Sequence, residues 1–159
     1  MGAMTNWQTF HAEAPQLAAA VEARLRATKH HVLATLRRDG SPRVSGTEVD
    51  FRGDDLVMGS MYGAVKARDL QRDGRFALHA NPGDGTMDGG DAKLAGRAEE
   101  VLDPAELASF VDDAHPPEPF HLFRLLLTDA VLTSLHPDGD RLVVETWHPG
   151  GPPVAVERR

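Results

Sequence analysis

The sequence predicts a mainly β protein, built as a small closed antiparallel barrel with a few helices. Six or seven short segments rich in apolar and β-branched residues follow one another, and most are joined by turns. These connections are too short for the crossovers that parallel strands need, which disfavours a doubly wound parallel sheet. Helices are expected only at the start and in two connections, so the strands must bury their apolar faces against each other.

The strands are expected from their composition and from the turns between them. Two lie within residues 30–51, where Asp39-Gly40 tolerates the positive backbone angles of a tight hairpin. The others are expected at residues 56–61, 75–80, 92–102, 121–135 and 141–147, with residues 153–159 as a last edge strand.

Helical spacing and start signals predict three helices. They are expected over residues 15–28, near 64–73 and over 103–114. In the first, Leu17, Val21 and Leu25 lie four apart on one face. The last begins with Asp103 as cap and Pro104 at the first helical position.

Composition and charge limit the classes of protein. With 159 residues, 41% hydrophobic and 26% charged, the chain is expected to form a single domain over residues 1–159, with residues 1–14 flexible or peripheral. No apolar run reaches the roughly 20 residues that cross a bilayer, and the N-terminus lacks the apolar core of a signal peptide, which predicts a cytoplasmic protein without a membrane partner. A net charge of −7 argues against nucleic acid as a partner.

Several chemistries have little support in the sequence. Without cysteine there is no disulfide, thiolate nucleophile or Cys-ligated metal. Prolines among His115, Glu118 and His121 prevent the helix that would align them, and the acidic loop at residues 82–91 lacks the bidentate Glu of a calcium loop, so no metal site is expected. No phosphate loop, nucleophile elbow or carboxylate pair stands out, and the catalytic residues stay unknown.

The segment Gly59–Arg75 is the best candidate for a binding site. Its four Lys and Arg residues outnumber its two Asp residues in a chain that is acidic as a whole. Gly59 and Ser60 end a strand, and the helix start that follows offers unpaired amides. The Lys66 ammonium in the first turn opposes the helix dipole, and a bound phosphate would reverse that effect. The alternative is a surface helix whose cations are solvated.

Two further places could contact a ligand, and each has a structural alternative. Gly46, within the small residues 43–49, leaves room for close approach of a ligand, or it marks a bulge at a barrel corner. Glu48 alternates with Gly46 and could face the same cavity, although a solvated carboxylate is the simpler interpretation. The Trp147 ring could stack on a flat aromatic ligand or close the core or an interface.

The order of these parts, and "LVMGSMYGAVKARDLQRDGRFALH" above all, resembles the flavin-binding split-barrel family, which includes pyridoxamine 5′-phosphate oxidase and the flavin- or deazaflavin-dependent oxidoreductases. The family's "ATLR-DG-PRV" hairpin has its match in residues Ala34 to Val44. Its "KAR-L--D-R-AL" helix and strand have theirs in residues Lys66 to Leu78. The resemblance runs from about His31 to Trp147.

The resemblance implies a six-stranded antiparallel split β-barrel that forms a homodimer, with cofactor sites in the clefts between subunits. The strand Arg43–Glu48 would lie along the cofactor ring, the strand end at Gly59 would meet the ring or ribityl chain, Lys66 would meet the phosphate, and Trp147 would close the site from the partner chain. The residues expected to bind cofactor are Arg43, Val44, Ser45, Gly46, Thr47, Gly59, Ser60, Met61, Val65, Lys66, Arg68 and Trp147.

The function that the resemblance implies is that of an FMN-dependent oxidoreductase acting on a small conjugated substrate. Coenzyme F420, a deazaflavin, is the alternative cofactor, and a non-catalytic protein that binds flavin or haem is the alternative class. Ala64 and Val65 stand where the pyridoxamine phosphate oxidases carry Ser and Arg, and the Arg-Leu-x-Pro ending that holds the vitamin substrate is missing. Vitamin B6 is therefore not the expected substrate.

Overall fold

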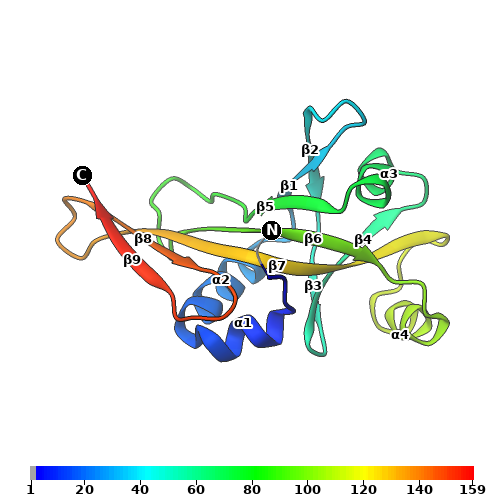
Figure 1. The fold of residues 1–159 in the computed structure, drawn as a ribbon, viewed down its shortest axis with the longest axis horizontal. Coiled ribbons are helices and arrows are strands. Elements are labelled where there is room, and N and C mark those ends of the chain that lie inside the picture. Colours follow the sequence, from blue (N-terminus) through cyan, green and yellow to red (C-terminus); the bar gives the residue numbers. More distant parts are fainter. Residues whose placement is uncertain (1–2) are drawn as a thin grey trace.

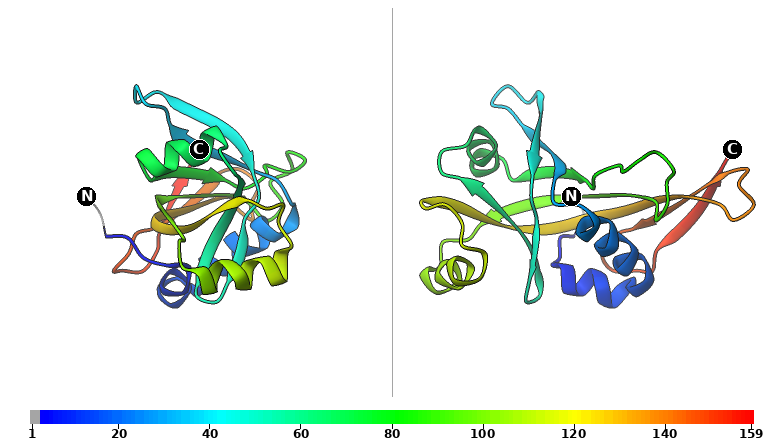
Figure 2. Two further views of the ribbon diagram at one scale, coloured as in Figure 1. Left: turned by 90° about the vertical axis from the view of Figure 1, so that its right-hand side faces the viewer. Right: turned by 180° about the vertical axis from the view of Figure 1, so that it is seen from behind.

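The computed structural model describes residues 3–159, which form one barrel with helices packed around it (Figures 1 and 2). Its helices are α1 (Trp7–Glu13), α2 (Pro15–Ala27), α3 (Val65–Arg72) and α4 (Pro104–Ala114). Its strands are β1 (His31–Leu36), β2 (Pro42–Thr47), β3 (Asp50–Arg52), β4 (Asp55–Met61), β5 (Arg75–His79), β6 (Asp91–Glu100), β7 (Phe120–Leu135), β8 (Leu142–Trp147) and β9 (Val154–Arg158).

The sheet closes into a barrel because the two strands at its ends are consecutive in the sequence. The hydrogen-bonded order is β2-β1-β5-β6-β7-β4-β3, and every pairing is antiparallel. Strands β2 and β3 stand at its two ends, yet only Glu48 and Val49 separate them in the sequence. If β2 and β3 are counted as one bent strand, the barrel has six antiparallel strands, as predicted. The barrel is split where β2 leaves β1 and β3 joins β4.

Local signals in the sequence set most of these boundaries. The β1–β2 hairpin turns at Asp39-Gly40, where Gly40 adopts a φ of +86°. Helix α4 begins as predicted, because the Asp103 side chain accepts a hydrogen bond from the Glu106 amide at 3.3 Å. The tail forms β9, which pairs only with β8 and is the predicted edge strand.

The core fills the barrel and the space between the sheet and helices α1 and α2. One row of buried, directly opposed residues crosses three strands, with Leu33, Leu78 and Leu94 on β1, β5 and β6. Helices α1 and α2 lie side by side on one side of the sheet (Figures 1 and 2). Because these side chains leave water on folding, this apolar burial is the main stabilising contribution.

Helix α1 corrects the expectation that residues 1–14 are flexible or peripheral; residues 1 and 2 lie outside the described part. The helix is capped by the Asn6 side chain, which accepts a hydrogen bond from the Thr9 amide at 2.9 Å. Its Trp7 and Phe10 are buried, and the Phe10 ring lies 4.5 Å from that of Trp147. A helix of 7 residues is too short to show a clear apolar period, so its role depends on packing.

Strands β8 and β9 continue from the long strand β7 and project away from α3 and α4 (Figure 1). All five residues of β9 are exposed. A smaller apolar cluster at the opposite end joins Phe110 of α4 to Val57, Val101 and Leu122, which holds α4 beside β4. Within residues 3–159, no helix has both the length and the apolar character that crossing a membrane requires.

His31 is a buried histidine whose two ring nitrogens are both engaged. Nε2 donates to the Leu25 carbonyl at 2.9 Å, and Nδ1 accepts from the Asn81 amide at 3.0 Å. Burial lowers the pKa of His31 below its ordinary value of 6.5, although the hydrogen bond to Leu25 opposes this effect. The folded protein therefore holds His31 neutral and fixes one tautomer.

We expect stability to fall on acidification because of His31. Below pH 6.5 the unfolded chain takes up a proton on this residue before the folded protein does. The free energy of unfolding should then decrease from pH 6.5 down to the lower folded-state pKa. Urea unfolding at a series of pH values measures this slope. The His31→Gln variant should show a shallower slope, and an unchanged slope would contradict the assignment.

Candidate functional site

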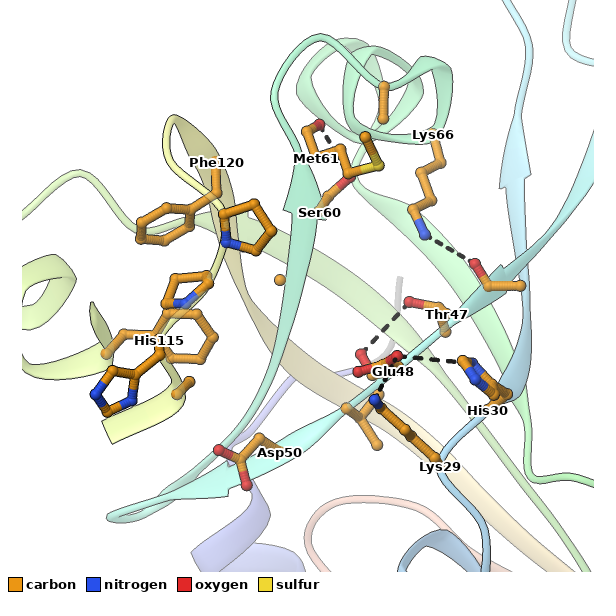
Figure 3. Close-up of a pocket in the computed structure, with 18 residues that line it drawn as sticks. Lys29, His30, Thr47, Glu48, Asp50, Ser60, Met61, Lys66, His115 and Phe120 are labelled. Carbon is orange, nitrogen blue, oxygen red and sulfur yellow. Dashed lines mark hydrogen bonds and ion pairs between the residues drawn. The ribbon is translucent and has the colours of Figure 1, made fainter. Parts of the chain in front are cut away.

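A cavity of about 720 Å³ lies at the split in the barrel (Figure 3). The end of β2, the end of β4, the start of α3 and the end of α4 surround it. Its lining residues are Lys29, His30, Gly46, Thr47, Glu48, Val49, Asp50, Gly59, Ser60, Met61, Ala64, Lys66, Phe110, Ala114, His115, Pro116, Pro117 and Phe120.

Unpaired strand edges give the cavity its polar backbone. β2 pairs only with β1, and β4 pairs with β3 only over Asp55–Val57, so its end from Met58 to Met61 is unpaired on that side. Unpaired amides and carbonyls of a strand edge are available to a ligand. The split therefore presents two edges of bare main chain to one space.

Gly46 lies in an unbroken stretch of the β1–β2 ladder, opposite Val32. The bulge alternative for this glycine is therefore wrong, and the register shift in the sheet lies at Ala95/Gly96 instead. A Cβ atom built on Gly46 meets nothing within 4 Å. Close packing within residues 3–159 therefore does not require a glycine here. The open space beside the Gly46 backbone could hold a flat group.

Lys66 reaches from α3 across the cavity to β2 (Figure 3). Its Nζ donates a hydrogen bond to the Gly46 carbonyl at 2.8 Å. Burial lowers the pKa of the ammonium, and the Glu48 carboxylate offsets this only in part. Helix α3 has no side-chain cap at its start, so its first-turn amides point out without a side-chain partner. This end of the cavity can accept an anion.

A buried carboxylate fixes α3 against β1 and β2. Asp69 accepts hydrogen bonds from Thr35 at 2.7 Å, from Arg43 at 2.7 Å and from Arg72 at 2.9 Å. Burial by itself raises the pKa of Asp69, but these hydrogen bonds outweigh it and lower the pKa below its usual value. The network holds the helix that carries Lys66 at a fixed place beside the split.

The structure brings half of the twelve predicted binding residues together in the cavity wall. These are Gly46, Thr47, Gly59, Ser60, Met61 and Lys66. Arg43 is instead engaged by Asp69, while Val44, Val65 and Arg68 are exposed outside the wall. Ser45, which neighbours Gly46 in β2, also lies outside it. Strand alternation explains part of this division, since neighbouring residues of β2 point to opposite faces.

The prediction that Trp147 contacts a cofactor is wrong for this chain. Its ring is 0% exposed and packs on Phe10. Its indole Nε1 donates to Glu13 at 3.3 Å, so its polar atom is also satisfied within the fold. The alternative of core packing is the one that the structure supports. The reason is helix α1, which covers the position that would otherwise be open.

The second wall of the cavity comes from α4 and from residues 114–120, where the sequence predicted a loop at the pocket without a role for its residues. Phe110 comes from α4, His115 follows that helix, and Phe120 begins β7. His115 and Phe120 lie on the other side of β4 from Lys66 in Figure 3. Glu48 does line the cavity, where its carboxylate lies 3.7 Å from both Lys29 and His30. Because Glu48 alternates with Gly46 in the sequence, its place in the cavity wall could have been predicted.

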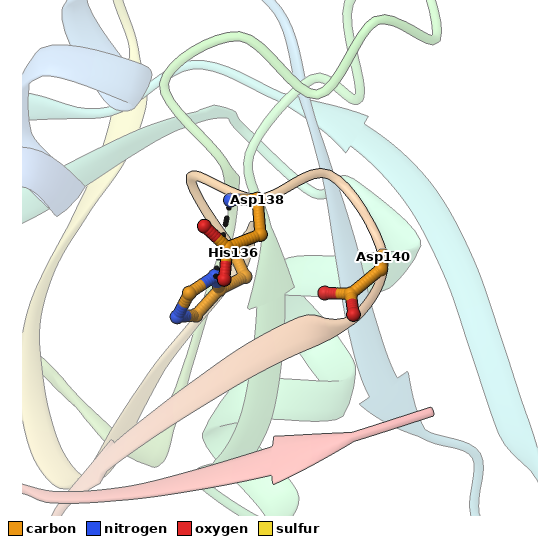
Figure 4. Close-up of side chains that lie close together, drawn as sticks. All are labelled: His136, Asp138 and Asp140. Atoms are coloured by element: carbon orange, nitrogen blue, oxygen red, sulfur yellow. Dashed lines mark hydrogen bonds and ion pairs between the residues drawn. The ribbon is translucent and has the colours of Figure 1, made fainter.

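Three side chains of types that can bind a metal ion lie close together outside the cavity, in the β7–β8 turn. His136, Asp138 and Asp140 have ligand atoms within 4.8 Å of one another (Figure 4). The Arg141 guanidinium already contacts all three, at 2.8 Å from His136 Nε2, 3.4 Å from Asp138 and 2.6 Å from Asp140. Because a cation occupies the acidic side of the group, it is an ion-pair network of the turn.

The fold and the site define a split-barrel protein with a cavity at its split, which Lys66 and the edge of β2 line. The family model for pyridoxamine 5′-phosphate oxidase matches residues 17–134. The chain therefore belongs to the pyridoxamine 5′-phosphate oxidase family, as the sequence resemblance implied. A comparison with curated proteins found no match.

Solved structures share this fold. A pyridoxamine 5′-phosphate oxidase-related FMN-binding protein from Nostoc punctiforme is 14% identical, with a TM-score of 0.65 over 91% of this chain and 95% of that one. PhzG from Burkholderia lata, in complex with tetrahydrophenazine-1-carboxylic acid, is 16% identical, with a TM-score of 0.58 over 91% and 89%. HutZ, a haem storage protein from Vibrio cholerae, is 17% identical, with a TM-score of 0.53 over 70% and 89%. At these identities the likeness concerns the fold alone.

Proposed function

We propose that the protein binds FMN in the cavity at the split and transfers hydride to or from a small conjugated substrate. One observation carries the proposal: the half-buried Lys66 ammonium faces the bare backbone of β2 at Gly46, where a side chain would have had room. A charged phosphate would compensate the buried ammonium, and a planar ring could lie against the glycine. The FMN-binding relative from Nostoc punctiforme is consistent with this cofactor.

The residues of the cavity fit the parts of FMN. Lys66 and the first-turn amides of α3 would bind the phosphate. The β2 edge at Gly46 and Thr47 would present amides and carbonyls to the polar edge of the ring, and Phe110 and Phe120 would provide apolar walls. When bound, the flavin supplies the hydride chemistry, while the protein orients it and limits access of water.

Purified protein gives the direct test. We expect flavin absorbance in the protein as isolated or after FMN addition, and oxidation of reduced nicotinamide in the presence of an enone or quinone. Failure to bind FMN would contradict the proposal, and coenzyme F420 is the next compound to titrate. Binding without turnover would leave the non-catalytic class. Haem belongs in the same titration, because His30 and His115 line the cavity and imidazole is a haem ligand.

We infer that the partner of this chain is a second copy. One row of directly opposed residues crosses the outer sheet face from β2 to β9, namely Gly46, Val32, His79, Lys93, Val131, Thr146 and Val154. Exposed valines follow this face, with Val44 at 69%, Val154 at 62% and Val32 at 40% exposure. A partly apolar face that extends over so many strands can be covered by the same face of another copy, through a two-fold axis.

The Val44→Glu variant tests this interface. We expect it to convert a dimer into a monomer, because two-fold symmetry would bury the new carboxylate in both subunits without a partner. Native mass spectrometry measures the subunit number and the cofactor mass together. The matched control is Leu102→Glu, since Leu102 is 74% exposed but lies outside the strands that form this face. A monomeric wild-type protein, or a dimeric Val44→Glu variant, would contradict the inference.

A further inference from the structure

A buried histidine supports the turn at Gly63, which leads into the first turn of α3. We call the Lys66 ammonium and the first-turn amides of α3 the phosphate corner, after the group that we propose they bind. His121 of β7 is 7% exposed and lies directly opposite Ser60 of β4. Its Nε2 lies 3.1 Å from the Gly63 amide, and its Nδ1 lies 2.9 Å from the Glu100 carboxylate. The imidazole thus joins the end of β6 to the turn after β4.

The partners determine the state of the ring. A backbone N–H can only donate, so Nε2 must accept and carries no proton. The proton is then on Nδ1, where it is donated to Glu100. A second proton, on Nε2, would place two N–H groups against each other at the Gly63 contact. The hydrogen bond to Gly63 therefore exists only with the neutral imidazole.

The turn that this bond holds determines where α3 begins. Gly63 adopts a φ of +74°, and the Ala64 amide donates to the Met61 carbonyl at 3.0 Å. Lys66 follows within the first turn of the helix, three residues after Gly63, and its Nζ donates to the Gly46 carbonyl at 2.8 Å. The position of His121 thus bears on the cavity although His121 itself lies outside the described wall.

Each element packed on the ring contributes a defined group. The turn contributes Tyr62, whose ring stacks on His121 at 5.0 Å with an angle of 11° between the planes. β6 contributes the Glu100 carboxylate, which also accepts from Gln71 of α3 at 2.8 Å, and β7 contributes Phe123 at 6.2 Å. Among these contacts, Glu100 is the sole charged group.

We propose that His121 is a positioning residue for the phosphate corner, which holds the Gly63 turn and Lys66 in place only while its imidazole is neutral. Acidification then releases the turn and weakens cofactor binding. The cofactor part of this inference rests on the proposed function, whereas the link between His121 and Gly63 concerns the free protein.

Two measurements separate these parts. In the free protein, nuclear magnetic resonance follows the Gly63 amide from about pH 8 to about pH 5, the range in which histidines change charge. We expect its shift and hydrogen exchange to change with pH in the wild type and not in His121→Gln. A glutamine oxygen can accept from Gly63 but does not titrate. His148→Gln, which alters an exposed histidine of the same chain, should behave as the wild type.

The second measurement is FMN affinity at both ends of this range. The phosphate of FMN gains a proton near about pH 6, a loss of charge that both proteins share. The wild type should therefore lose on the order of two- to tenfold more affinity on acidification than His121→Gln, the amount that one hydrogen bond represents. His121→Leu, which cannot accept, should bind weakly at every pH, and His121→Gln should restore binding at high pH.

The outcomes are distinct. Identical Gly63 titration in the wild type and His121→Gln would overturn the role of His121 in the turn. Different titration with equal losses of FMN affinity would overturn the coupling to Lys66. A wild type that binds no FMN at either pH would contradict the proposed function and with it the cofactor part, while the Gly63 result would still decide the role in the turn.

Discussion

Replacing Lys66 with Ala is expected to weaken FMN binding by roughly 10- to 150-fold, because a charge-assisted contact to a phosphate contributes about 1.5–3 kcal/mol. The side chain is half-buried, and its ammonium contacts the cavity wall at Gly46. Without it, the phosphate would keep the first-turn amides of α3 but lose this ammonium as a partner. Fluorescence quenching of FMN by the variant and the wild type measures the loss.

Riboflavin distinguishes a phosphate contact from general damage to the site. It carries the same ring without the phosphate, so its affinity should change little in Lys66→Ala. Arg68→Ala is the matched control on the same helix, because the Arg68 side chain is exposed and lies outside the cavity wall. Equal losses for FMN and riboflavin would contradict the assignment, as would a larger loss in Arg68→Ala than in Lys66→Ala.

The Gly96→Ala variant is expected to lose at least about 3 kcal/mol of folding free energy, or to fail to fold. Gly96 lies at the register shift between β6 and β7, opposite Leu127. A Cβ atom there would lie 1.8 Å from the Leu126 carbonyl oxygen and 2.8 Å from its carbon. These are backbone atoms, so the clash can be relieved only by opening the ladder between two central strands.

Gly46→Ala is the control for this prediction. Gly46 is also a strand glycine, but its Cβ atom would meet nothing within 4 Å, and we expect a change within about 0.5 kcal/mol. Urea unfolding of the cofactor-free proteins measures both. If Gly96→Ala unfolds at the same urea concentration as the wild type, the close approach of β6 to β7 is not a constraint on the sequence.

The sequence by itself determined most of the elements and much of one cavity wall. Asp39-Gly40 produced the hairpin, Asp103 the start of α4, and the basic segment after Gly59 the helix that carries Lys66. These features depend on contacts between residues close in the chain, such as caps, turns and the period of apolar residues. Such signals are local, and one sequence is enough to interpret them.

Only the tertiary structure decided which distant segments meet at the site. Trp147 is buried because Phe10 of the unpredicted helix α1 packs on it, and Arg43 is engaged because α3 brings Asp69 against β2. The wall that contains Phe110 comes from α4. This helix lies beside the end of β4 because β7, which follows α4 in the chain, pairs with β4. Contacts of this kind depend on sheet register and on the order of strands in the barrel, which no local pattern in the sequence specifies.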